Sequence, residues 1–297
     1  MVGALTVPCC APAPSVPTPE VAAPVASPSE SPGCGKRTIG AGERQLQVAG
    51  HTGLYLVSLP REYDSRRAYP LVFALHGRNR NHHDCQRTDC TGIQSELGER
   101  AVLVYPQSLR EPLNAEKSGW EHPEERDLNV PFFEALWTQV EADYCVDRER
   151  VVVAGASSGG TFAHLLACRY GDRLQAVAAV AGGFPNPETC RGAPAAILIH
   201  GIDDPHVPIA RGELSREAYV KRSGCQPSTV PPLADMHAAI RQARDAKVEE
   251  ARCVDVAGCA TDSPLRWCEH SYGGYDGSTH GWPPLGGQLI SSFIGKL

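Results

Sequence analysis

Short apolar runs alternate with helix-like segments from residue 34 onward, and this alternation limits the possible folds more than any other feature. Residues 129–144 have helical periodicity, and a closing helix is expected from about residue 285. The runs that read as buried strands are 54–60, 69–77, 101–106, 150–155, 176–183, 195–201 and 265–272. Apolar strands separated by helices are typical of a parallel sheet covered on both faces. The sequence therefore predicts an α/β fold with a doubly wound, mostly parallel central sheet.

Composition supports one large domain over residues 34–297. Forty-two per cent of the 297 residues are hydrophobic, which is enough for a core of that size. The net charge of −6 gives no electrostatic reason to expect nucleic acid or an anionic membrane as a partner. No apolar run approaches the ~18 residues that a membrane span needs. Residues 234–252 are alanine-rich and charged, and we interpret them as an exposed helix without a chemical role.

The first 33 residues differ from the rest of the chain. Residues 11–33 are rich in Pro, Ala and Ser, a composition that cannot form a core, so we expect a disordered, extended tether. The preceding "MVGALTVPCC" is too short for a whole signal peptide and lacks its basic start. A trimmed export signal, a misassigned start and a lipid anchor at Cys9 or Cys10 are the alternatives. We assign residues 1–33 to export and tethering.

Twelve cysteines are too many for a cytosolic chain of this size without metal sites. None forms a CxxC pair, and ten remain after Cys9 and Cys10, so the sequence predicts disulfides and secretion. The stretch "HHDCQRTDC" has two interpretations. Its histidines and cysteines could bind a metal, or Cys85 and Cys90 could close a small disulfide loop, which the spacing favours. We expect no metal.

The stretch "RVVVAGASSGGTFAHLLACRYG" contains the strongest motif of the chain. Its "GASSG" matches G-x-S-x-G with Ser157 at the centre, between an apolar run and a helical pattern. A nucleophilic serine needs this strand–turn–helix context, because the sharp turn lifts its hydroxyl above the sheet. A nucleotide-binding turn is the alternative, but the stretch is neither GxGxxG nor GxxxxGK[ST]. The motif therefore predicts that Ser157 is a nucleophile.

A serine hydroxyl needs a base, which in this class of fold follows an acid in the chain. His280 lies on a Gly-rich loop between the last strand and the last helix, where a catalytic imidazole is expected. The other candidates have ordinary explanations. His206 is too near the acid, His237 lies on a solvated helix face, and His270 reads as a structural histidine within a strand.

The acid and the oxyanion donors follow two other predicted strands. Asp203 and Asp204 come directly after the strand at 195–201, and the pattern alone does not choose between them. The tetrahedral intermediate needs two backbone N–H donors. We expect one from Ser158, the residue after the nucleophile, and one from Arg78, where Gly77 lets the chain turn.

Over residues 34–297 the chain resembles the secreted α/β-hydrolase esterases grouped as carbohydrate esterase family 1. That group includes feruloyl esterases, acetylxylan esterases and polyhydroxybutyrate depolymerase-like proteins. The "GCGK" at residues 33–36 is most similar to type D feruloyl esterases. The resemblance rests on "YPLVFALHG", "YCVDRERVVVAGASSGG", "AVAAVAGG", "HGIDDPHVPI", "SGCQP" and "THGWP", in this order.

The resemblance implies a role for each site residue. The family's aspartate falls on Asp204, its serine on Ser157 and its loop histidine on His280, with the oxyanion donors on Arg78 and Ser158. It also implies a disulfide between Cys225 and Cys259. The chain departs from the family at Arg78, where many relatives have a small residue or Cys, in the "GSTHGWPP" loop, and in the extra residues 234–252.

These observations predict a secreted, monomeric serine esterase that needs no cofactor. The resemblance points to feruloyl or related hydroxycinnamoyl esters on plant cell-wall polysaccharide. A polyhydroxybutyrate or short-chain hydroxyalkanoate depolymerase and an acetylxylan esterase are the alternatives within the class. A serine peptidase and a non-catalytic binding module are the alternatives outside it. The peptidase is disfavoured because the sequence shows no added propeller domain. The binding module is disfavoured because it would not need all three triad residues in order.

Overall fold

The computed structural model describes Met1 and residues 29–87, 92–109, 119–120, 128–184, 190–226, 233–273 and 277–297. Most of the predicted tether, with Cys9 and Cys10, lies outside these residues, as does Cys90. Among the described helices, none is long and apolar enough to cross a membrane.

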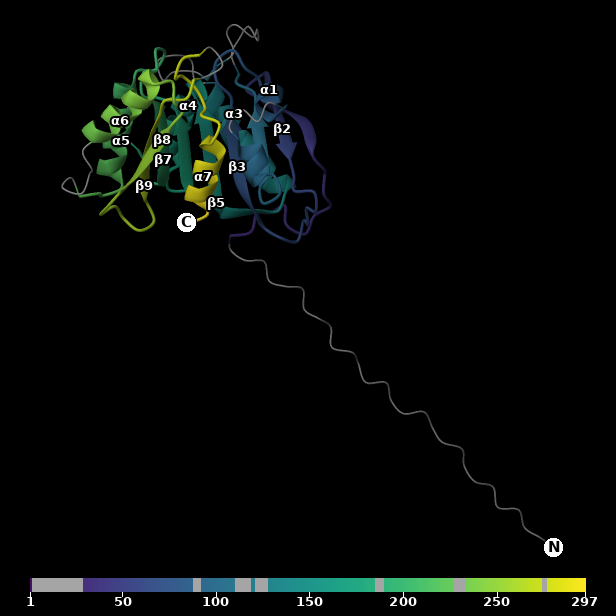
Figure 1. Cartoon of the computed structure of the whole chain (residues 1–297). Coiled ribbons are helices and arrows are strands. Elements are labelled where there is room, and N and C mark those ends of the chain that lie inside the picture. The colour runs from purple at the N-terminus through teal and green to yellow at the C-terminus, as the bar shows by residue number, and fades with distance from the viewer. Residues whose placement is uncertain are drawn as a thin grey trace.

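The described strands form one nine-stranded sheet in the order β1-β2-β4-β3-β5-β6-β7-β9-β8 (Figure 1). Strands β4, β3, β5, β6, β7 and β9 pair in parallel, and β1, β2 and β8 join by antiparallel pairing. The strands are β1 (Gly42–Val48), β2 (His51–Ser58), β3 (Tyr69–Leu75), β4 (Val102–Pro106), β5 (Val146–Ala156), β6 (Ala176–Val180), β7 (Ala195–Gly201), β8 (Ala251–Val256) and β9 (Leu265–His270). The predicted α/β fold with a mostly parallel sheet is confirmed.

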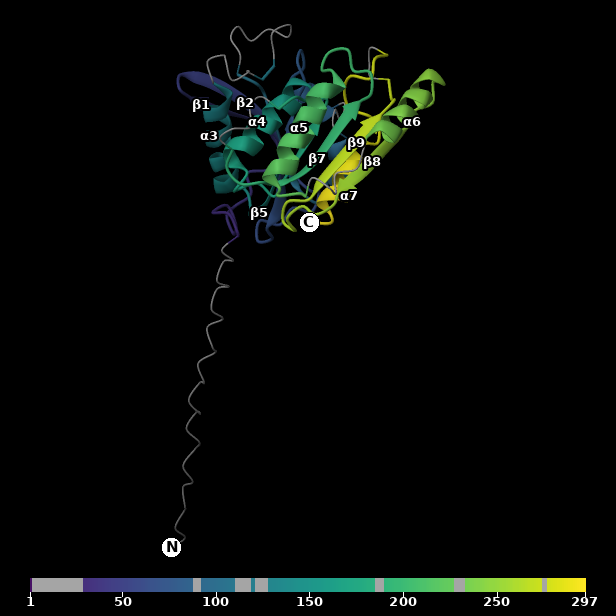
Figure 2. The ribbon, with the colours of Figure 1, turned by 90° about the vertical axis from the view of Figure 1, so that its left-hand side faces the viewer.

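Helices cover both faces of the sheet. Successive side chains of a strand point to opposite faces, so a strand that is apolar throughout contributes to two cores. In β3, Phe73 and Leu75 enter one core, and Val72 and Ala74 enter the other. Figure 2 shows α3, α4 and α5 over the first face. The helices of the first core are α3 (Asn129–Asp143), α4 (Ser158–Tyr170), α5 (Ile209–Arg222) and α6 (Ala234–Asp245). Those of the second are α1 (His82–Arg87), α2 (Ile93–Leu97) and α7 (Gly286–Ile294).

Residues 234–252 are not the single exposed helix that the composition predicts. Helix α6 ends at Asp245 and the chain enters β8 at Ala251. Met236, Ile240 and Ala243 recur at helical spacing and are buried, so one face of α6 packs on the sheet. Strand β8 pairs antiparallel with β9 and closes that edge of the sheet. The prediction of a helix was therefore wrong beyond residue 245. The prediction that this helix is exposed was wrong for the face of α6 that packs on the sheet.

Disulfides cross-link the fold at several points. The predicted Cys225–Cys259 bond is confirmed. Cys85 is also disulfide-bonded, so its sulfur is not a metal ligand in "HHDCQRTDC". The other described pairs are Cys34–Cys145, Cys168–Cys190 and Cys253–Cys268. These bonds agree with the oxidising compartment that the cysteine count predicts.

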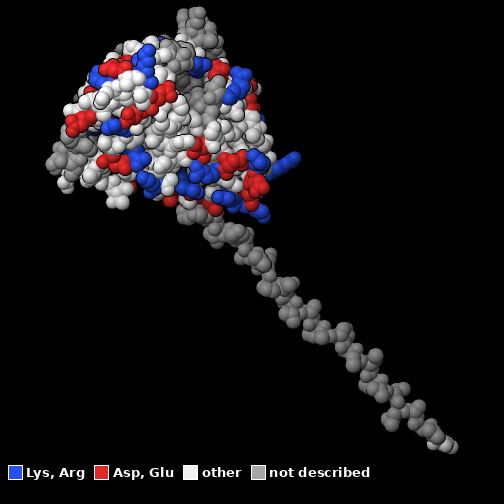
Figure 3. Space-filling model, in the orientation of Figure 1, with Lys and Arg blue, Asp and Glu red and all other residues white. Residues whose placement is uncertain are grey.

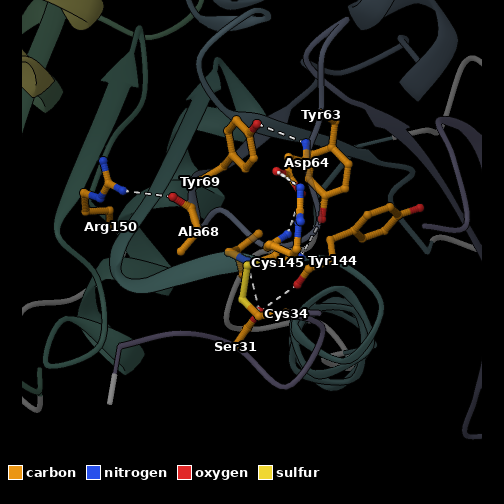
Figure 4. Close-up of a disulfide and its surroundings, with 11 residues drawn as sticks. Ser31, Cys34, Tyr63, Asp64, Ala68, Tyr69, Tyr144, Cys145 and Arg150 are labelled. Atoms are coloured by element: carbon orange, nitrogen blue, oxygen red, sulfur yellow. Dashed lines mark hydrogen bonds and ion pairs between the residues drawn. A yellow bond between two sulfur atoms is a disulfide. The ribbon is translucent and has the colours of Figure 1, made fainter. Parts of the chain in front are cut away.

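The start of the folded domain lies against β5, around the Cys34–Cys145 bond (Figure 4). The Ser31 hydroxyl donates to the carbonyl of Tyr144 at 2.6 Å and accepts from the N–H of Val146 at 2.9 Å. The N–H of Arg148 donates to the carbonyl of Ser29 at 2.8 Å. Ser29 and Ser31 thus already contact the sheet, although the composition changes only at residue 33.

Candidate active site

Ser157 occupies the turn between β5 and α4 in a conformation that few non-glycine residues adopt. Its φ is 55° and its ψ is −120°. Such backbone strain costs of order 1–3 kcal/mol and is usually found where function needs it. Two hydrogen bonds hold the turn: the N–H of Ser157 donates to the carbonyl of Val180 at 2.9 Å, and its carbonyl accepts from Thr161 at 2.9 Å. The neighbouring strand β6 and the first turn of α4 therefore fix the orientation of the side chain.

The glycines on either side of Ser157 leave no room for a side chain. A Cβ on Gly155 would lie 2.3 Å from the carbonyl oxygen of Gly159. A Cβ on Gly159 would lie 2.5 Å and 2.6 Å from the carbonyl oxygens of Leu75 and His76. These contacts are with backbone atoms, which cannot rotate away. The glycines of the motif thus allow the close approach of α4 to β5 and β3.

Three side chains from three different segments form a continuous hydrogen-bonded chain. His280 Nε2 lies 2.9 Å from Ser157 Oγ, and His280 Nδ1 lies 2.7 Å from Asp204 Oδ2. Ser157 follows β5, Asp204 follows β7 and His280 precedes α7, so the parallel strands deliver the first two to the same edge of the sheet. The structure brings together the three residues that the sequence singles out.

Asp204 is fully enclosed and its oxygens have several donors. Its Oδ1 accepts from the N–H groups of His206 and Val207, both at 2.8 Å. Burial alone would raise the pKa of Asp204, but hydrogen bonds from His280 and these backbone groups hold it below the usual value. The carboxylate therefore stays ionised beside the imidazole. Asp203 instead points to α6, where its carboxylate lies 3.1 Å from Arg241 Nη1.

The loop that carries His280 is anchored to the end of β7. The Thr279 hydroxyl accepts from the N–H of Asp203 at 3.2 Å, and Thr279 is fully buried. The ring of His206 stands edge-on to that of His280, with centroids 4.9 Å apart. The ring of His206, a residue not expected to be the base, thus lies against the imidazole, and its backbone N–H donates to Asp204.

Ser157 also lies beside the turn that follows β3. A Cβ on Gly77 would lie 3.7 Å from Ser157 Cβ, so this turn passes directly beside the serine. Arg78 follows Gly77 and its side chain is exposed. A Cβ on Gly119 would contact both Arg78 Cα, at 3.7 Å, and Ser158 Oγ, at 3.5 Å. Arg78 and Ser158, the two predicted oxyanion donors, therefore lie close together beside Ser157.

A buried histidine, which was not predicted from the sequence, holds this turn in place. Burial lowers the pKa of His76 to about 4, so its ring is neutral at physiological pH. Its Nδ1 donates to the carbonyl of Gly77 at 2.8 Å, and its Nε2 accepts from the N–H of Ser108 at 3.2 Å. Trp120 Nε1 donates to the His76 carbonyl at 2.7 Å while its ring stacks on Phe162 of α4. In the sequence, the "HG" that follows the strand could have identified His76, whereas no local pattern indicates a role for Trp120.

The remaining candidate histidines lie elsewhere. His237 is not on a solvated face: its Nδ1 lies 2.8 Å from Glu269 and its Nε2 2.9 Å from Glu213. His270 is buried within β9, as expected, and burial lowers its pKa to about 4. Among the described residues, Glu43, His82 and His83 form a cluster of potential metal ligands, and none of them belongs to the hydrogen-bonded chain of Ser157, His280 and Asp204.

Comparisons with known proteins identify the family. The family model described as "Putative esterase" matches residues 51–294. Feruloyl esterase C of Emericella nidulans is 30% identical over 265 residues, which is 87% of this chain and 86% of the relative. Feruloyl esterase D of Neurospora crassa is 30% identical over 220 residues, 69% of this chain and 72% of the relative.

Solved structures show the same fold at low sequence identity. A thermostable esterase is 16% identical with a TM-score of 0.50, covering 61% of this chain and 51% of its own. A protein named pOPH is 14% identical with a TM-score of 0.51, covering 76% of this chain and 83% of its own. With the family match over most of the domain, the chain belongs to this esterase family and is a carboxylic-ester hydrolase similar to the fungal feruloyl esterases.

Proposed function

We propose that the chain is a secreted serine esterase that releases hydroxycinnamoyl groups, such as feruloyl groups, from plant cell-wall polysaccharide. The observation that carries the proposal is the hydrogen-bonded chain from Ser157 through His280 to Asp204. This arrangement supports a Ser-His-Asp triad, in which the acid orients the base and the base activates the hydroxyl.

In the proposed acylation step, Ser157 Oγ attacks the ester carbonyl carbon and His280 Nε2 takes the hydroxyl proton. The Asp204 carboxylate holds His280 Nδ1–H and stabilises the imidazolium that forms. The tetrahedral intermediate collapses when His280 gives its proton to the leaving alcohol oxygen. Water then attacks the acyl-serine, with His280 again as the base, and the free carboxylic acid and Ser157 are released.

The negative oxygen of each intermediate is stabilised by the backbone N–H groups of Arg78 and Ser158. Their position close together beside Ser157 supports this role, as does the hydrogen bond by which neutral His76 holds the turn after β3. Such donors are effective because they are fixed before the reaction and need no reorganisation. The change from a small residue to Arg78 leaves the backbone donor intact.

The substrate and the location are inferred from chemistry and relatives together. The disulfide bonds support an extracellular enzyme, because such bonds persist in oxidising compartments. The relatives named feruloyl esterase C and D support aromatic acyl esters. Acidic and basic side chains are interspersed on the face in Figure 3, which shows no large basic area for a polyanion.

The test compares three substrates on the purified full chain: methyl ferulate, acetylated xylan and hydroxybutyrate oligomers. The Ser157→Ala variant, measured in parallel, subtracts hydrolysis that does not depend on the triad. We expect release of ferulic acid to exceed release of the other two acids. Activity on hydroxybutyrate oligomers or acetylated xylan alone would contradict the feruloyl assignment while leaving the triad in place.

A further inference from the structure

Two histidines and a glutamate gather where β1 meets α1. The ligand atoms of Glu43, His82 and His83 all lie within 4.8 Å of one another. His82 Nε2 lies 2.9 Å from Glu43 Oε2, and His83 Nε2 contacts the same oxygen. Adjacent residues of a helix normally point about 100° apart. Here both rings instead converge on one carboxylate, with centroids 4.2 Å apart.

The hydrogen bonds of His82 leave its Nε2 facing the carboxylate. Gln107 Oε1 accepts from the backbone N–H of His82 at 3.1 Å, so this amide oxygen is oriented as an acceptor. The same oxygen lies 3.2 Å from His82 Nδ1, which therefore carries the proton. Nε2, on the other side of the ring, lies 2.9 Å from Glu43 Oε2 and is the ring nitrogen placed to bind a cation together with that oxygen. An Nδ1–H held by an amide or carboxylate oxygen is the usual outer support of a metal-binding imidazole.

The exposure of the three side chains suits a site with an entrance. His82 is 5% exposed and fixed by Gln107, whereas His83 and Glu43 are 45% and 44% exposed. Zinc–nitrogen and zinc–oxygen distances are about 2.0–2.2 Å. The half-exposed side chains of Glu43 and His83 have room to adjust toward that range.

From this geometry we propose a binding site for a divalent transition metal of the zinc class, with Glu43, His82 and His83 as its protein ligands. Imidazole ligands favour zinc over calcium or magnesium, which take mostly oxygen. Two imidazoles and one carboxylate leave a coordination position for water. The two histidines of "HHDCQRTDC" thus serve as ligands. Glu43 supplies the third ligand, which disulfide-bonded Cys85 cannot provide.

The bound ion would join the first strand of the sheet to the helix that follows the Arg78 turn. Glu43 lies in β1, and His82 begins α1 four residues after Arg78. The consequence is structural: the metal would raise the melting temperature of the chain. This inference does not depend on the esterase mechanism.

Equilibrium dialysis against Zn²⁺ tests the site on the full chain after EDTA treatment. Alkylating free thiols first removes Cys9 and Cys10 as alternative ligands. We expect wild type to bind one more equivalent of Zn²⁺ than His83→Ala and Glu43→Gln, and its melting temperature to rise on adding the ion. His51→Ala, which removes a histidine of β2 outside the cluster, should bind as wild type does.

Both altered side chains are half-exposed, so the variants are expected to fold, and their far-ultraviolet circular dichroism checks this. Cobalt gives a second readout, because the visible absorption of Co²⁺ reports nitrogen and oxygen ligands directly. That absorption should appear in wild type and His51→Ala and be lost in His83→Ala. Equal Zn²⁺ binding by wild type and His83→Ala, or no binding by wild type, would overturn the proposal.

Discussion

Asp203 and Asp204 are neighbours in the chain, but their carboxylates lie in opposite environments. Asp204 is enclosed against His280, whereas the Asp203 side chain is 41% exposed and pairs with Arg241 on the surface. The residue pattern alone did not separate them, because both follow the same strand. Only the position of the His280 loop, packed against the end of β7 through Thr279, decides which one meets the imidazole.

This pair provides a matched test of the proposed acid. Asp204→Asn should lower kcat for p-nitrophenyl acetate by roughly 10⁴-fold, because the amide favours the wrong imidazole tautomer. Asp203→Asn removes only an exposed ion pair, worth about 0–1 kcal/mol, and should leave kcat within a few-fold of wild type. Steady-state kinetics at neutral pH measures both. The reverse order of effects would assign the acid to Asp203.

At the scale of elements, the packing of α4 on β5 and β3 depends on Gly159. Gly159→Ala would place a Cβ 2.5 Å from a backbone oxygen of β3, so α4 must shift. We expect a loss of about 1–3 kcal/mol in the free energy of unfolding. Urea denaturation measures it.

Gly183→Ala is the control for this effect. A Cβ there would meet Arg211 Cβ at 3.5 Å, an ordinary contact, and should change the free energy of unfolding by no more than about 0.5 kcal/mol. If the two variants were equally stable, close packing would not explain the glycine of the motif.

The sequence predicts the buried elements far better than the edges of the sheet. Strands such as β3 and β7 are apolar on both faces and stand out as uninterrupted runs. Strand β1 has the sequence GERQLQV, with polar residues at most positions, and it was missed because only tertiary pairing makes it a strand. The same holds for β8, which is mostly exposed and is defined by its pairing with β9 and the Cys253–Cys268 bond.

In the candidate active site, the G-x-S-x-G motif can be recognised from the sequence, whereas the residues that support it cannot. Ser157 lies in a recognisable strand–turn–helix, whereas Trp120 reaches His76 across 44 positions of the chain. Glu43 joins His82 across 39 positions. Contacts between residues so far apart in the chain arise from the topology of the sheet, and they produce no periodic pattern in the sequence.

At the scale of the whole molecule, the disulfides should differ in their contribution to stability. Cys34 and Cys145 are 111 residues apart, and Cys253 and Cys268 are 15 apart. In the chain-entropy model, loops of about 100 and 15 residues contribute about 4.7 and 3 kcal/mol. Replacing the first pair by serine should therefore destabilise the chain by about 1–2 kcal/mol more than replacing the second. Chemical denaturation compares the two double variants, and the opposite ranking would contradict this account.

Acid should destabilise the molecule through its buried histidines. Burial lowers the pKa of His76 and His270 from 6.5 to about 4, and that of His164 to about 3. The unfolded chain takes up these protons from about pH 6.5 downward and the folded chain does not, so stability is full above pH 6.5 and falls below it. Each histidine should remove about 1.4 kcal/mol per pH unit between the two pKa values.

Urea unfolding from pH 7 to pH 4.5 measures this dependence. The His164→Gln variant should have a free energy of unfolding that falls less steeply with decreasing pH, because one of the buried histidines no longer contributes. This difference in slope is expected whatever the effect of the substitution on stability at pH 7. A free energy of unfolding that stayed constant below pH 6.5 would show that these rings are protonated in the folded chain.

Kinetics of the Ser157→Ala variant are the most direct test of Ser157 as the nucleophile. The variant leaves His280, Asp204 and both backbone donors in place and removes only the proposed attacking oxygen. We predict that kcat/KM for p-nitrophenyl acetate falls by roughly 10⁴–10⁶-fold, with an unchanged circular dichroism spectrum. A folded Ser157→Ala protein that hydrolyses this ester within about tenfold of wild type would contradict the assignment of Ser157 as the nucleophile.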